Sequence, residues 1–219
     1  MNHFTRTTEL ILIRHSETVW NGEGRIQGQR DSPLSERGRS QAQRLAERLR
    51  GEPPQIVVSS DLGRALHTAA PVASAVGLSI VIDGQWRERS FGVLEGMTWS
   101  EIERDRPADH ARLAARDAHF RPEGGESVMD FRDRVMEAFG HAVERARGGR
   151  IAVITHGGAL GVLYREAKRL PFEAPRDYPL HNASINRFVL DGAGLRLEQW
   201  GDIAHLEGLG ADAASLHRS

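Results

Sequence analysis

Two short apolar runs of the chain each end beside a histidine, and one of these histidines follows an arginine. Leu10 to Ile13 continues directly into Arg14 and His15, and the run Ile151 to Ile154 is followed one residue later by His156. A neutral imidazole nitrogen can attack phosphorus, and the planar arginine fork binds phosphate oxygens through paired, charge-assisted hydrogen bonds. An isolated arginine–histidine pair also occurs in ordinary structural loops, so this pair alone is weak evidence, and the second histidine adds to it.

A third apolar run, Ile56 to Val58, leads through polar residues to Arg64 at the start of a helical pattern. All three runs are short, are bounded by polar residues and precede helical spacing, which indicates βα units of a mostly parallel sheet. Ligands of such sheets bind beyond the carboxyl ends of the strands. We therefore predict that two arginines and two histidines surround one phosphoryl group, whose transfer needs mainly positioning and charge stabilisation. These residues are Arg14, His15, Arg64 and His156.

The elements that must position these residues have their own signals. Ser35 is a good N-cap for a helix that carries apolar residues at helical spacing and ends at Gly51. A second helix is predicted from about Ser127 to Ala146, with two glycines as its terminator. A third covers roughly Gly63 to Val76, and Pro71 is expected to bend or divide it.

The alternating pattern predicts an α/β fold, namely a three-layer α/β/α sandwich with a mostly parallel central sheet and helices on both faces. Phe188 to Leu190 and Leu195 to Trp200 flank a turn and predict a strand pair, and one antiparallel edge strand is expected. The arginine-rich segment of about residues 97–121 is interpreted as a short helical cap inserted over one end of the sheet. With 219 residues, one domain over 1–219 is the better prediction, and the tail after Gly208 is expected to be loosely ordered.

Composition excludes several classes of function. Lys and Arg total 29 and Asp and Glu total 30, so the net charge of -1 predicts no nucleic-acid or membrane-surface partner. The chain has no cysteine, which excludes disulfides, thiolate zinc sites and cysteine-based phosphatase chemistry. Met1 to Glu9 is polar and no later segment approaches a membrane-spanning run, so a soluble, cytoplasmic protein is expected.

The motifs around these residues resemble those of the histidine phosphatase superfamily, the phosphoglycerate-mutase-like proteins. The resemblance covers most of the chain and is specific because the motifs occur in a fixed order. Its core consists of Arg14-His15-Ser16-Glu17-Thr18 with Trp20-Asn21, Ser60-Asp61-Leu62-Gly63-Arg64-Ala65 and Thr155-His156-Gly157-Gly158. It extends to Gln27-Gly28, Asp31-Ser32-Pro33-Leu34-Ser35, Arg87-Glu88, Phe91-Gly92-Val93-Leu94-Glu95-Gly96 and Pro122-Glu123-Gly124-Gly125-Glu126-Ser127.

The resemblance implies a role for each matching position, beginning with His15 as the residue that carries the phosphoryl group in the intermediate. Glu88 matches the general acid, which protonates the leaving oxygen and later deprotonates the attacking water. From the sequence alone, a salt bridge of Glu88 with Arg87 or Arg89 would be the simpler expectation. No metal and no cofactor is implied. The phosphate pocket would comprise Arg14, Arg64, His156 and Asn21, and further substrate contacts would come from Gln27, Gly28 and Gly157.

One position departs from the resemblance. The family usually has glycine after the nucleophilic histidine, whereas this chain has Ser16. We expect Ser16 to be tolerated with its hydroxyl as an added donor, although a side chain at this position can alter the pocket and lower activity. Three other histidines lack metal-ligand spacing and are interpreted as surface or packing residues. They are His67, His141 and His205, whereas His181-Asn182 resembles a family segment near the active site.

Two reactions fit the predicted pocket. We favour hydrolysis of a small phosphorylated metabolite over phosphoglycerate mutase activity, because the segment from Glu88 to Glu123 is short for the long insertion that shields phosphohistidine from water in the mutases. A non-catalytic phosphate-binding module is a third alternative, which the complete set of charged residues disfavours. A homodimer is compatible with the resemblance. Five cap arginines either hold a second anionic group of the substrate or form a solvated helix face: Arg104, Arg106, Arg112, Arg116 and Arg121.

Overall fold

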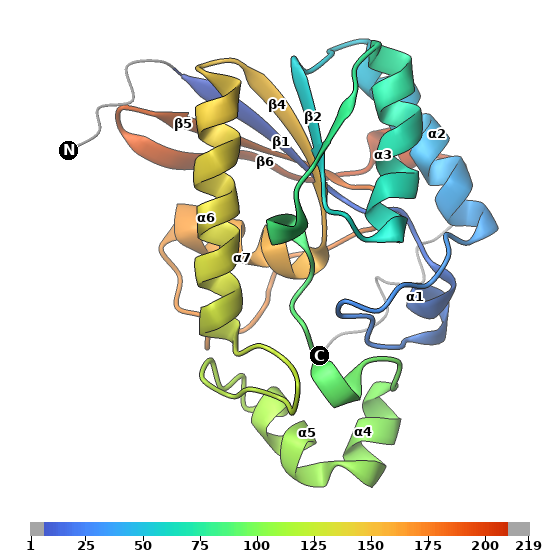
Figure 1. Cartoon of the computed structure of the whole chain (residues 1–219), viewed down its shortest axis with the longest axis vertical. Helices are drawn as coiled ribbons and strands as arrows, with labels where there is room; N and C mark the ends of the chain where they lie inside the picture. Colours follow the sequence, from blue (N-terminus) through green and yellow to red (C-terminus); the bar gives the residue numbers. More distant parts are fainter. Residues whose placement is uncertain (1–6, 210–219) are drawn as a thin grey trace.

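Six strands form one sheet in a computed structural model that describes residues 7–209 (Figure 1). The strand order is β3-β2-β4-β1-β5-β6. The first four are parallel to one another, whereas β5 is antiparallel to both of its neighbours, β1 and β6. The strands are β1 Thr8–Arg14, β2 Ile56–Ser59, β3 Ile80–Ile82, β4 Arg150–Thr155, β5 Ile185–Asp191 and β6 Gly194–Asp202.

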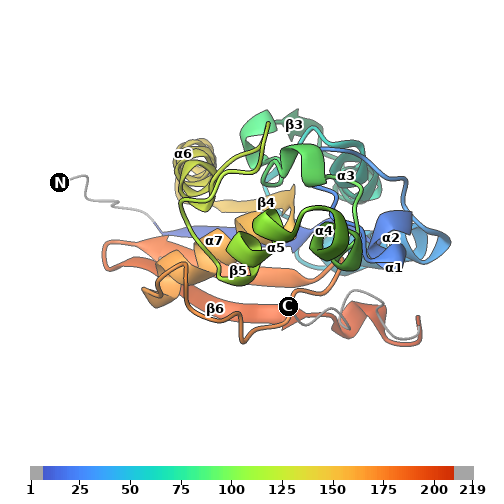
Figure 2. The same ribbon diagram turned by 90° about the horizontal axis from the view of Figure 1, so that it is seen from below.

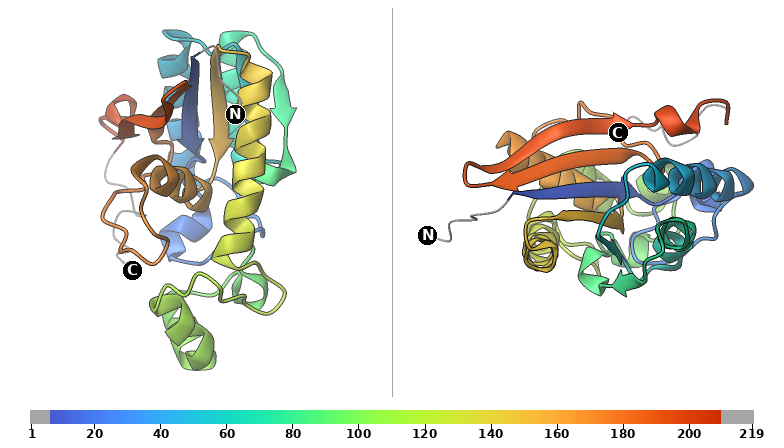
Figure 3. Two further views of the ribbon diagram at one scale, coloured as in Figure 1. Left: turned by 90° about the vertical axis from the view of Figure 1, so that its left-hand side faces the viewer. Right: turned by 90° about the horizontal axis from the view of Figure 1, so that it is seen from above.

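Helices cover both faces of the sheet because the side chains of each strand point alternately to opposite faces. The four covering helices are α2 Glu36–Arg50, α3 Gly63–Val76, α6 Val128–Ala146 and α7 Gly157–Lys168. Leu10 and Leu12 of β1 are fully buried with α6 and α7, and Ile11 and Ile13 are fully buried with α2 and α3. Figure 3 shows α6 on one side of the sheet and α2 with α3 on the other. The predicted three-layer α/β/α sandwich is confirmed.

Two short helices form the predicted cap at the end of the sheet toward which β1 and β4 run (Figure 1, Figure 2). α4, Trp99–Asp105, begins with a capping box between Thr98 and Glu101. α5, Pro107–Ala114, begins with the proline of the arginine-rich segment, a residue suited to the first turn of a helix. None of the helices within residues 7–209 combines the length and the apolar composition that a bilayer span requires. The other short elements are α1 Val19–Glu23, η1 Gly84–Trp86, η2 Gly92–Leu94 and η3 Ala204–Leu206.

Helix boundaries follow most of the predicted capping signals. α2 begins after its N-cap Ser35, whose side chain accepts a backbone hydrogen bond, and it ends at Gly51. α6 begins after Ser127 and ends at Ala146, as predicted, and its C-cap is Arg147 in the left-handed conformation, directly before the two glycines. α3 runs through Pro71 as one helix, so the predicted division is wrong. Buried residues before and after the proline hold both halves of α3 against the sheet.

Two features of the sheet differ from the prediction. The edge strand β6 is in antiparallel pairing, as predicted, but its partner β5 is also antiparallel to β1, so the sheet has two antiparallel pairings and not one. β3 has no counterpart in the prediction, because its apolar run of three residues, Ile80 to Ile82, is followed by the short turn Gly84–Trp86 and not by the helical spacing that marks a βα unit. The predicted loose tail after Gly208 lies outside the described residues except for Leu209.

Candidate active site

The carboxyl ends of three neighbouring parallel strands bring the sequence-predicted residues together. β2, β4 and β1 are adjacent in the sheet, and Arg14 and Thr155 are paired at the ends of β1 and β4. A histidine follows each of these two residues, and the rings of His15 and His156 have centroids 5.2 Å apart. Arg64 lies on α3, after β2, and its charge acts on both histidines. The three strand ends therefore meet at one site.

His15 is buried, and its two ring nitrogens have different surroundings. The residue is 3% exposed, and its Nδ1 lies 2.8 Å from the carbonyl oxygen of Ser16. Because a carbonyl can only accept, the proton is on Nδ1 and the lone pair is on Nε2. Within residues 7–209 no hydrogen bond involves Nε2. Burial lowers the pKa of His15 well below its ordinary value of 6.5, and the charges of Arg64 and Arg14 lower it further, so the ring is neutral at neutral pH.

Ser16, which stands where the family usually has glycine, holds this histidine through its backbone. Its carbonyl accepts from His15, and its N–H donates to Thr68 Oγ1 over 2.9 Å. Thr68 Oγ1 donates in turn to the carbonyl oxygen of Arg64 over 2.8 Å. The Ser16 side chain is therefore compatible with these backbone bonds. Its buried Oγ has no partner among the described residues, and its expected role as an added donor stays a prediction.

Arg64 is held rigidly at the amino end of α3, with only 1% of its surface exposed. Its Nη2 donates to the carbonyl oxygen of Gly28 over 2.6 Å. Its Nη1 donates to the Arg30 carbonyl oxygen and to the Asp31 carboxylate over 2.8 and 3.0 Å. Asp31 also accepts from the Gly63 N–H over 2.6 Å and so caps the first turn of α3. The loop of residues 28–31 thus fixes the guanidinium beside the histidines.

His156 has the opposite tautomer from His15. Its Nε2 lies 2.9 Å from Ser60 Oγ, and the same hydroxyl oxygen accepts from the Leu62 N–H over 3.3 Å. The Ser60 hydroxyl has no other acceptor among the described residues, so we assign its proton to the bond with Nε2, which leaves the ring proton on Nδ1. Nδ1 is buried without a partner in the part of the chain that is described, so it can donate to a bound anion. Burial lowers the pKa of His156 well below 6.5, and Arg64 and His15 lower it further.

Arg14 and Asn21 complete the predicted phosphate contacts. Arg14 ends β1, and its Nη1 donates to the carbonyl oxygen of Leu180. Asn21 Oδ1 accepts hydrogen bonds within its own helical turn and accepts from Asn182 Nδ2 over 3.3 Å. These bonds occupy the amide oxygen and leave the Asn21 amide donors for an anion. Asn182 also donates to the His15 carbonyl oxygen over 2.9 Å, so this residue of the His181-Asn182 segment fixes the backbone of the proposed nucleophile.

Glu88 does not form the salt bridge that its arginine neighbours suggest. Arg87 pairs with Asp61 over 2.5 Å, and the Arg89 guanidinium donates to two backbone carbonyl oxygens. The Glu88 carboxylate accepts from the backbone N–H groups of Arg89 and Gly158 over 2.8 and 2.9 Å. The simpler expectation from the sequence is therefore wrong, because both arginines are engaged elsewhere.

The segment that carries Glu88 is fixed by Arg134 of α6. Arg134 Nη2 donates to the Glu88 carbonyl oxygen over 3.1 Å, and Nη1 donates to the carbonyl oxygens of two preceding residues over 2.8 and 3.0 Å. Arg134 is itself paired with Glu126 over 2.7 Å. Burial lowers the pKa of Arg64, and the charge of Glu88 opposes this shift more strongly than any other group. The negative charge of Glu88 therefore acts on the guanidinium group of Arg64.

The remaining predicted contacts differ in what they offer a ligand. Gly28 has a φ of 54° and packs against the carboxylate of Glu95, so a side chain has no room there and its carbonyl serves Arg64. Gln27 is buried, and its Oε1 has no partner among the described residues. Gly157 begins α7, where the helix dipole and free N–H groups favour an anion. Gln27 and Gly157 thus offer groups to a ligand, whereas Gly28 positions Arg64.

Four residues that hold the site have no role in the sequence analysis. Glu95 is buried, and its carboxylate accepts from the N–H groups of residues 29, 30 and 91 over 3.0, 3.2 and 2.9 Å. It thereby joins the loop that holds Arg64 to the segment that follows Glu88. Three of the four lie inside motifs that match the family, which could have pointed to them, whereas nothing in the local sequence points to Arg134. The residues are Asp31, Ser60, Glu95 and Arg134.

Most of the cap arginines are neutralised by neighbouring carboxylates. The exception among the five is Arg116, which donates to the carbonyl oxygen of Ala174 over 3.3 Å. For the other four, the interpretation as a solvated helix face is the better one. Their ion pairs are Arg104–Asp105, Arg106–Asp109 with Glu123, Arg112–Asp117 and Arg121–Asp130.

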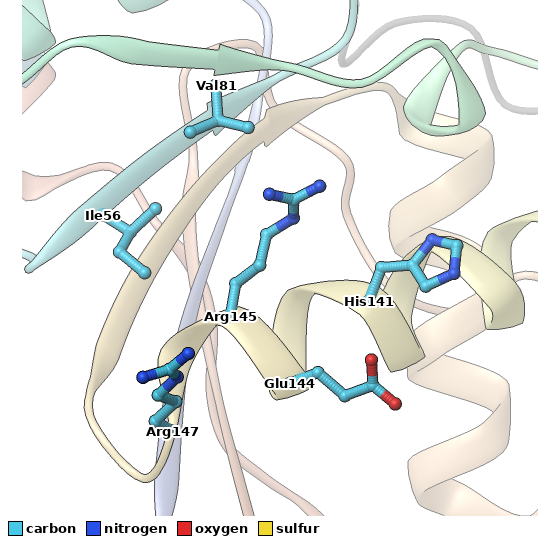
Figure 4. A pocket seen from close by; sticks show the side chains of 6 residues that line it. All are labelled: Ile56, Val81, His141, Glu144, Arg145 and Arg147. Atoms are coloured by element: carbon cyan, nitrogen blue, oxygen red, sulfur yellow. The ribbon is translucent and has the colours of Figure 1, made fainter.

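A surface depression of about 680 Å³ lies at the other end of the sheet (Figure 4). It is lined by Ile56, Val81, His141, Glu144, Arg145 and Arg147. Ile56 is the first residue of β2, whereas the site lies beyond the last residue of that strand, so none of the predicted site residues borders the depression. His141 and His67 are exposed, as predicted, and His205 is partly buried beside η3. Within residues 7–209 no three histidine, aspartate or glutamate side chains are grouped as metal ligands.

Removal of the Ser60 hydroxyl is expected to lower kcat by roughly fivefold, because one neutral hydrogen bond contributes about 1 kcal/mol to holding the His156 tautomer. Steady-state kinetics of Ser60→Ala with a phosphomonoester measures this effect. Ser59→Ala is the matched control, since it loses an adjacent buried hydroxyl that donates to the Ser60 carbonyl and does not contact a histidine. Equal rates for the two variants would contradict the assigned tautomer.

The buried histidines also predict how stability depends on pH. The pKa values of His15 and His156 in the folded chain lie below 6.5, so just below pH 6.5 the unfolded chain binds more protons than the folded chain. The free energy of unfolding therefore decreases as the pH falls through 6.5 toward the folded pKa values. Urea unfolding at a series of pH values measures this slope. The double variant His15→Asn, His156→Asn should show a flatter dependence in this window, and an unchanged slope would contradict the shifts.

Comparison with known proteins finds matches over almost the whole described chain. The family model described as histidine phosphatase superfamily (branch 1) matches residues 10–203. Phosphoglycerate mutase-like protein 4 of Arabidopsis thaliana is 38% identical over 206 residues, which are 92% of this chain and 88% of that protein.

Solved structures agree with the sequence match. YhfR of Bacillus stearothermophilus superposes with a TM-score of 0.85 at 34% identity, covering 91% of this chain and 100% of that chain. A mycobacterial glucosyl-3-phosphoglycerate phosphatase superposes with a TM-score of 0.77 at 33% identity, covering 90% of this chain and 99% of that chain. Similar proteins thus carry the names of both reactions considered from the sequence.

Proposed function

The chain belongs to the histidine phosphatase superfamily, branch 1, and we propose that it hydrolyses small phosphomonoesters through an intermediate phosphorylated on His15. The observation that carries this proposal is that the two neutral histidines have opposite tautomers. Neutral His15 has its lone pair on Nε2, and neutral His156, with its ring centroid 5.2 Å away, keeps a proton on Nδ1. One ring is thus suited to attack phosphorus, and the other is suited to bind the phosphoryl oxygens.

In the first step, Nε2 of His15 attacks the phosphorus atom opposite the leaving oxygen. The N–P bond forms while the P–O bond breaks, and protonated Glu88 gives its proton to the leaving oxygen, so the alcohol departs neutral. Charge develops on the three equatorial phosphoryl oxygens, and preorganised donors stabilise it without reorganisation. The proposed donors are the guanidinium groups of Arg14 and Arg64, Nδ1 of His156 and the amide of Asn21.

In the second step, a water molecule attacks the phosphorus atom of phosphohistidine. Ionised Glu88 takes a proton from this water, the N–P bond breaks, and His15 returns to its neutral form. Glu88 ends the cycle protonated and ready for the next substrate. Backbone N–H groups of Arg89 and Gly158 hold its carboxyl group in place, so the same oxygen atoms can serve both steps.

Phosphoglycerate mutase activity is the second candidate, because the Arabidopsis relative is named mutase-like. The cap favours hydrolysis, since its two helices have only 7 and 8 residues and offer little cover against water. The name of the mycobacterial structure, a phosphatase, supports the same preference.

The test is release of inorganic phosphate from a panel of phosphomonoesters by the full chain in EDTA. Interconversion of the two phosphoglycerate isomers, with and without bisphosphoglycerate, is measured in parallel. Phosphate release in EDTA without interconversion supports the hydrolase and its independence of metal. Interconversion that requires bisphosphoglycerate would establish the mutase, and phosphate binding without turnover of any ester would indicate a non-catalytic module.

Other parts of the sequence analysis keep the status of predictions. These are the absence of a cofactor and of a nucleic-acid partner, a cytoplasmic location, and a homodimer.

A further inference from the structure

Three arginines from different elements gather where the cap meets the loop between α7 and β5. Arg116 follows α5, Arg165 lies on α7, and Arg176 lies on the loop. Arg116 Nη1 and Arg165 Nη2 donate to the same carbonyl oxygen, that of Ala174, over 3.3 and 3.0 Å. Arg176 is exposed but partly covered by its neighbours, and this partial burial lowers its pKa; Tyr178 opposes the shift, and the nearby charges of Arg116 and Arg165 add to it. We call Arg116, Arg165 and Arg176 the distal arginine cluster.

Two arginines of this cluster, Arg165 and Arg176, have no carboxylate partner within residues 7–209. Arg165 is only 9% exposed, donates to the Tyr178 hydroxyl, and has a buried Nε without a partner among the described residues. Glu173 and Asp177 belong to the same loop, yet within residues 7–209 no carboxylate forms an ion pair with Arg165 or Arg176. A buried charge without a counter-ion is costly, so an anionic partner would stabilise this arrangement.

The cluster lies one turn of α7 from the phosphate pocket. A Cβ atom at Gly157 would lie 3.6 Å from Arg14 Nε, and a Cβ atom at Gly161 would lie 3.8 Å from Arg165 Nη1. Gly157 and Gly161 are four residues apart and therefore share one face of the helix, separated by about 6 Å along its axis. The two guanidinium groups thus follow one another along the same side of α7.

We propose that the distal arginine cluster binds a second anionic group, a carboxylate or a phosphate, at the far end of the substrate. The natural substrate class is then an elongated phosphomonoester with an anion at both ends. The exposed side chain of Arg176 makes the contact, while buried Arg165 supplies charge and holds the loop through Tyr178 and Ala174. This inference rests on the proposed hydrolysis at His15.

The test compares three synthetic substrates that differ only at the distal end: n-hexyl phosphate, the same chain ending in a carboxylate, and the same chain ending in a second phosphate. Arg176→Gln should lower kcat/KM for the two substrates with a distal anion by about 10- to 100-fold, mainly through KM, because a hydrogen bond to a charged group is lost. Its activity on hexyl phosphate should stay at the wild-type level. Arg176→Lys should recover part of the loss, since the charge remains without the planar fork.

Arg145→Gln is the matched control, because Arg145 is also exposed, also lacks an ion pair in the described residues, and lies in the depression at the other end of the sheet (Figure 4). It should leave all three substrates unchanged. Equal effects of Arg176→Gln on all three substrates, or no effect on any, would overturn the assignment while hydrolysis itself stands. Failure of the wild-type chain to hydrolyse any phosphomonoester would instead contradict the proposed hydrolase function itself. A larger loss on one of the two anionic ends identifies the carboxylate or the phosphate as the preferred group.

Discussion

Replacing His15 by alanine is expected to lower kcat for phosphate release by on the order of 10⁴-fold or more, because the covalent route disappears with its nucleophile. The side chain has the features that this role requires: it is buried and neutral, and its Nδ1 proton is tied to the Ser16 carbonyl oxygen. Direct attack by water in the remaining pocket would supply only residual turnover. The measurement is phosphate release at saturating substrate, with circular dichroism to verify the fold.

Binding should survive this substitution better than turnover. The guanidinium group of Arg64 is held by the loop of residues 28–31 and not by His15, so inorganic phosphate and vanadate should still bind to the variant. His67→Ala is the matched control, since it removes an exposed histidine of α3 and should keep the wild-type rate. A folded His15→Ala variant with a rate within about tenfold of wild type would exclude His15 as the nucleophile.

Glu88→Gln is expected to lower kcat for an alkyl phosphate by about 10²- to 10⁴-fold, the range typical of general acid–base catalysis. The loss should be smaller for 4-nitrophenyl phosphate, because its leaving oxygen departs as a stable anion without needing a proton. The measurement is the dependence of kcat/KM on the pKa of the leaving alcohol. A steeper dependence in the variant than in wild type shows that the proton comes from this residue.

The control for this variant is Glu103→Gln, which changes an exposed carboxylate of α4 by the same substitution. It should match wild type with both leaving groups. Equal losses for activated and unactivated leaving groups in Glu88→Gln would mean that Glu88 has a structural role, such as holding the amino end of α7 through Gly158.

Elements with strong local signals could be predicted from the sequence. The runs around Leu10 and Ile151 are short and apolar because both faces of their strands are covered by helices, and Ser35 and Ser127 cap helices as their side chains allow. β3 is absent from the prediction, because its apolar run, Ile80 to Ile82, has only three residues and is not followed by the helical spacing of a βα unit. The place of β5 inside the sheet could not be predicted either, since pairing with β6 leaves no mark that distinguishes an edge from an interior strand.

The candidate site shows the same division. His15, Arg64 and His156 follow strands that are neighbours in the sheet, so their convergence follows from the topology of parallel strands. The surroundings of Glu88 depend on partners distant in sequence, including Gly158, and a local reading favours an arginine salt bridge that the fold does not make. The role of Arg134 could not be predicted either, because its acceptors are backbone carbonyls of a segment more than forty residues away.

The most direct test of the proposed reaction is to find where the phosphoryl group resides during turnover. The full chain is mixed with a phosphomonoester, quenched in alkali, which preserves phosphohistidine, and analysed by mass spectrometry of its peptides. A phosphoryl group on His15, formed as fast as phosphate is released, is the predicted result. Steady release of phosphate with His15 unmodified, or with the label on another residue, would contradict covalent catalysis by this histidine.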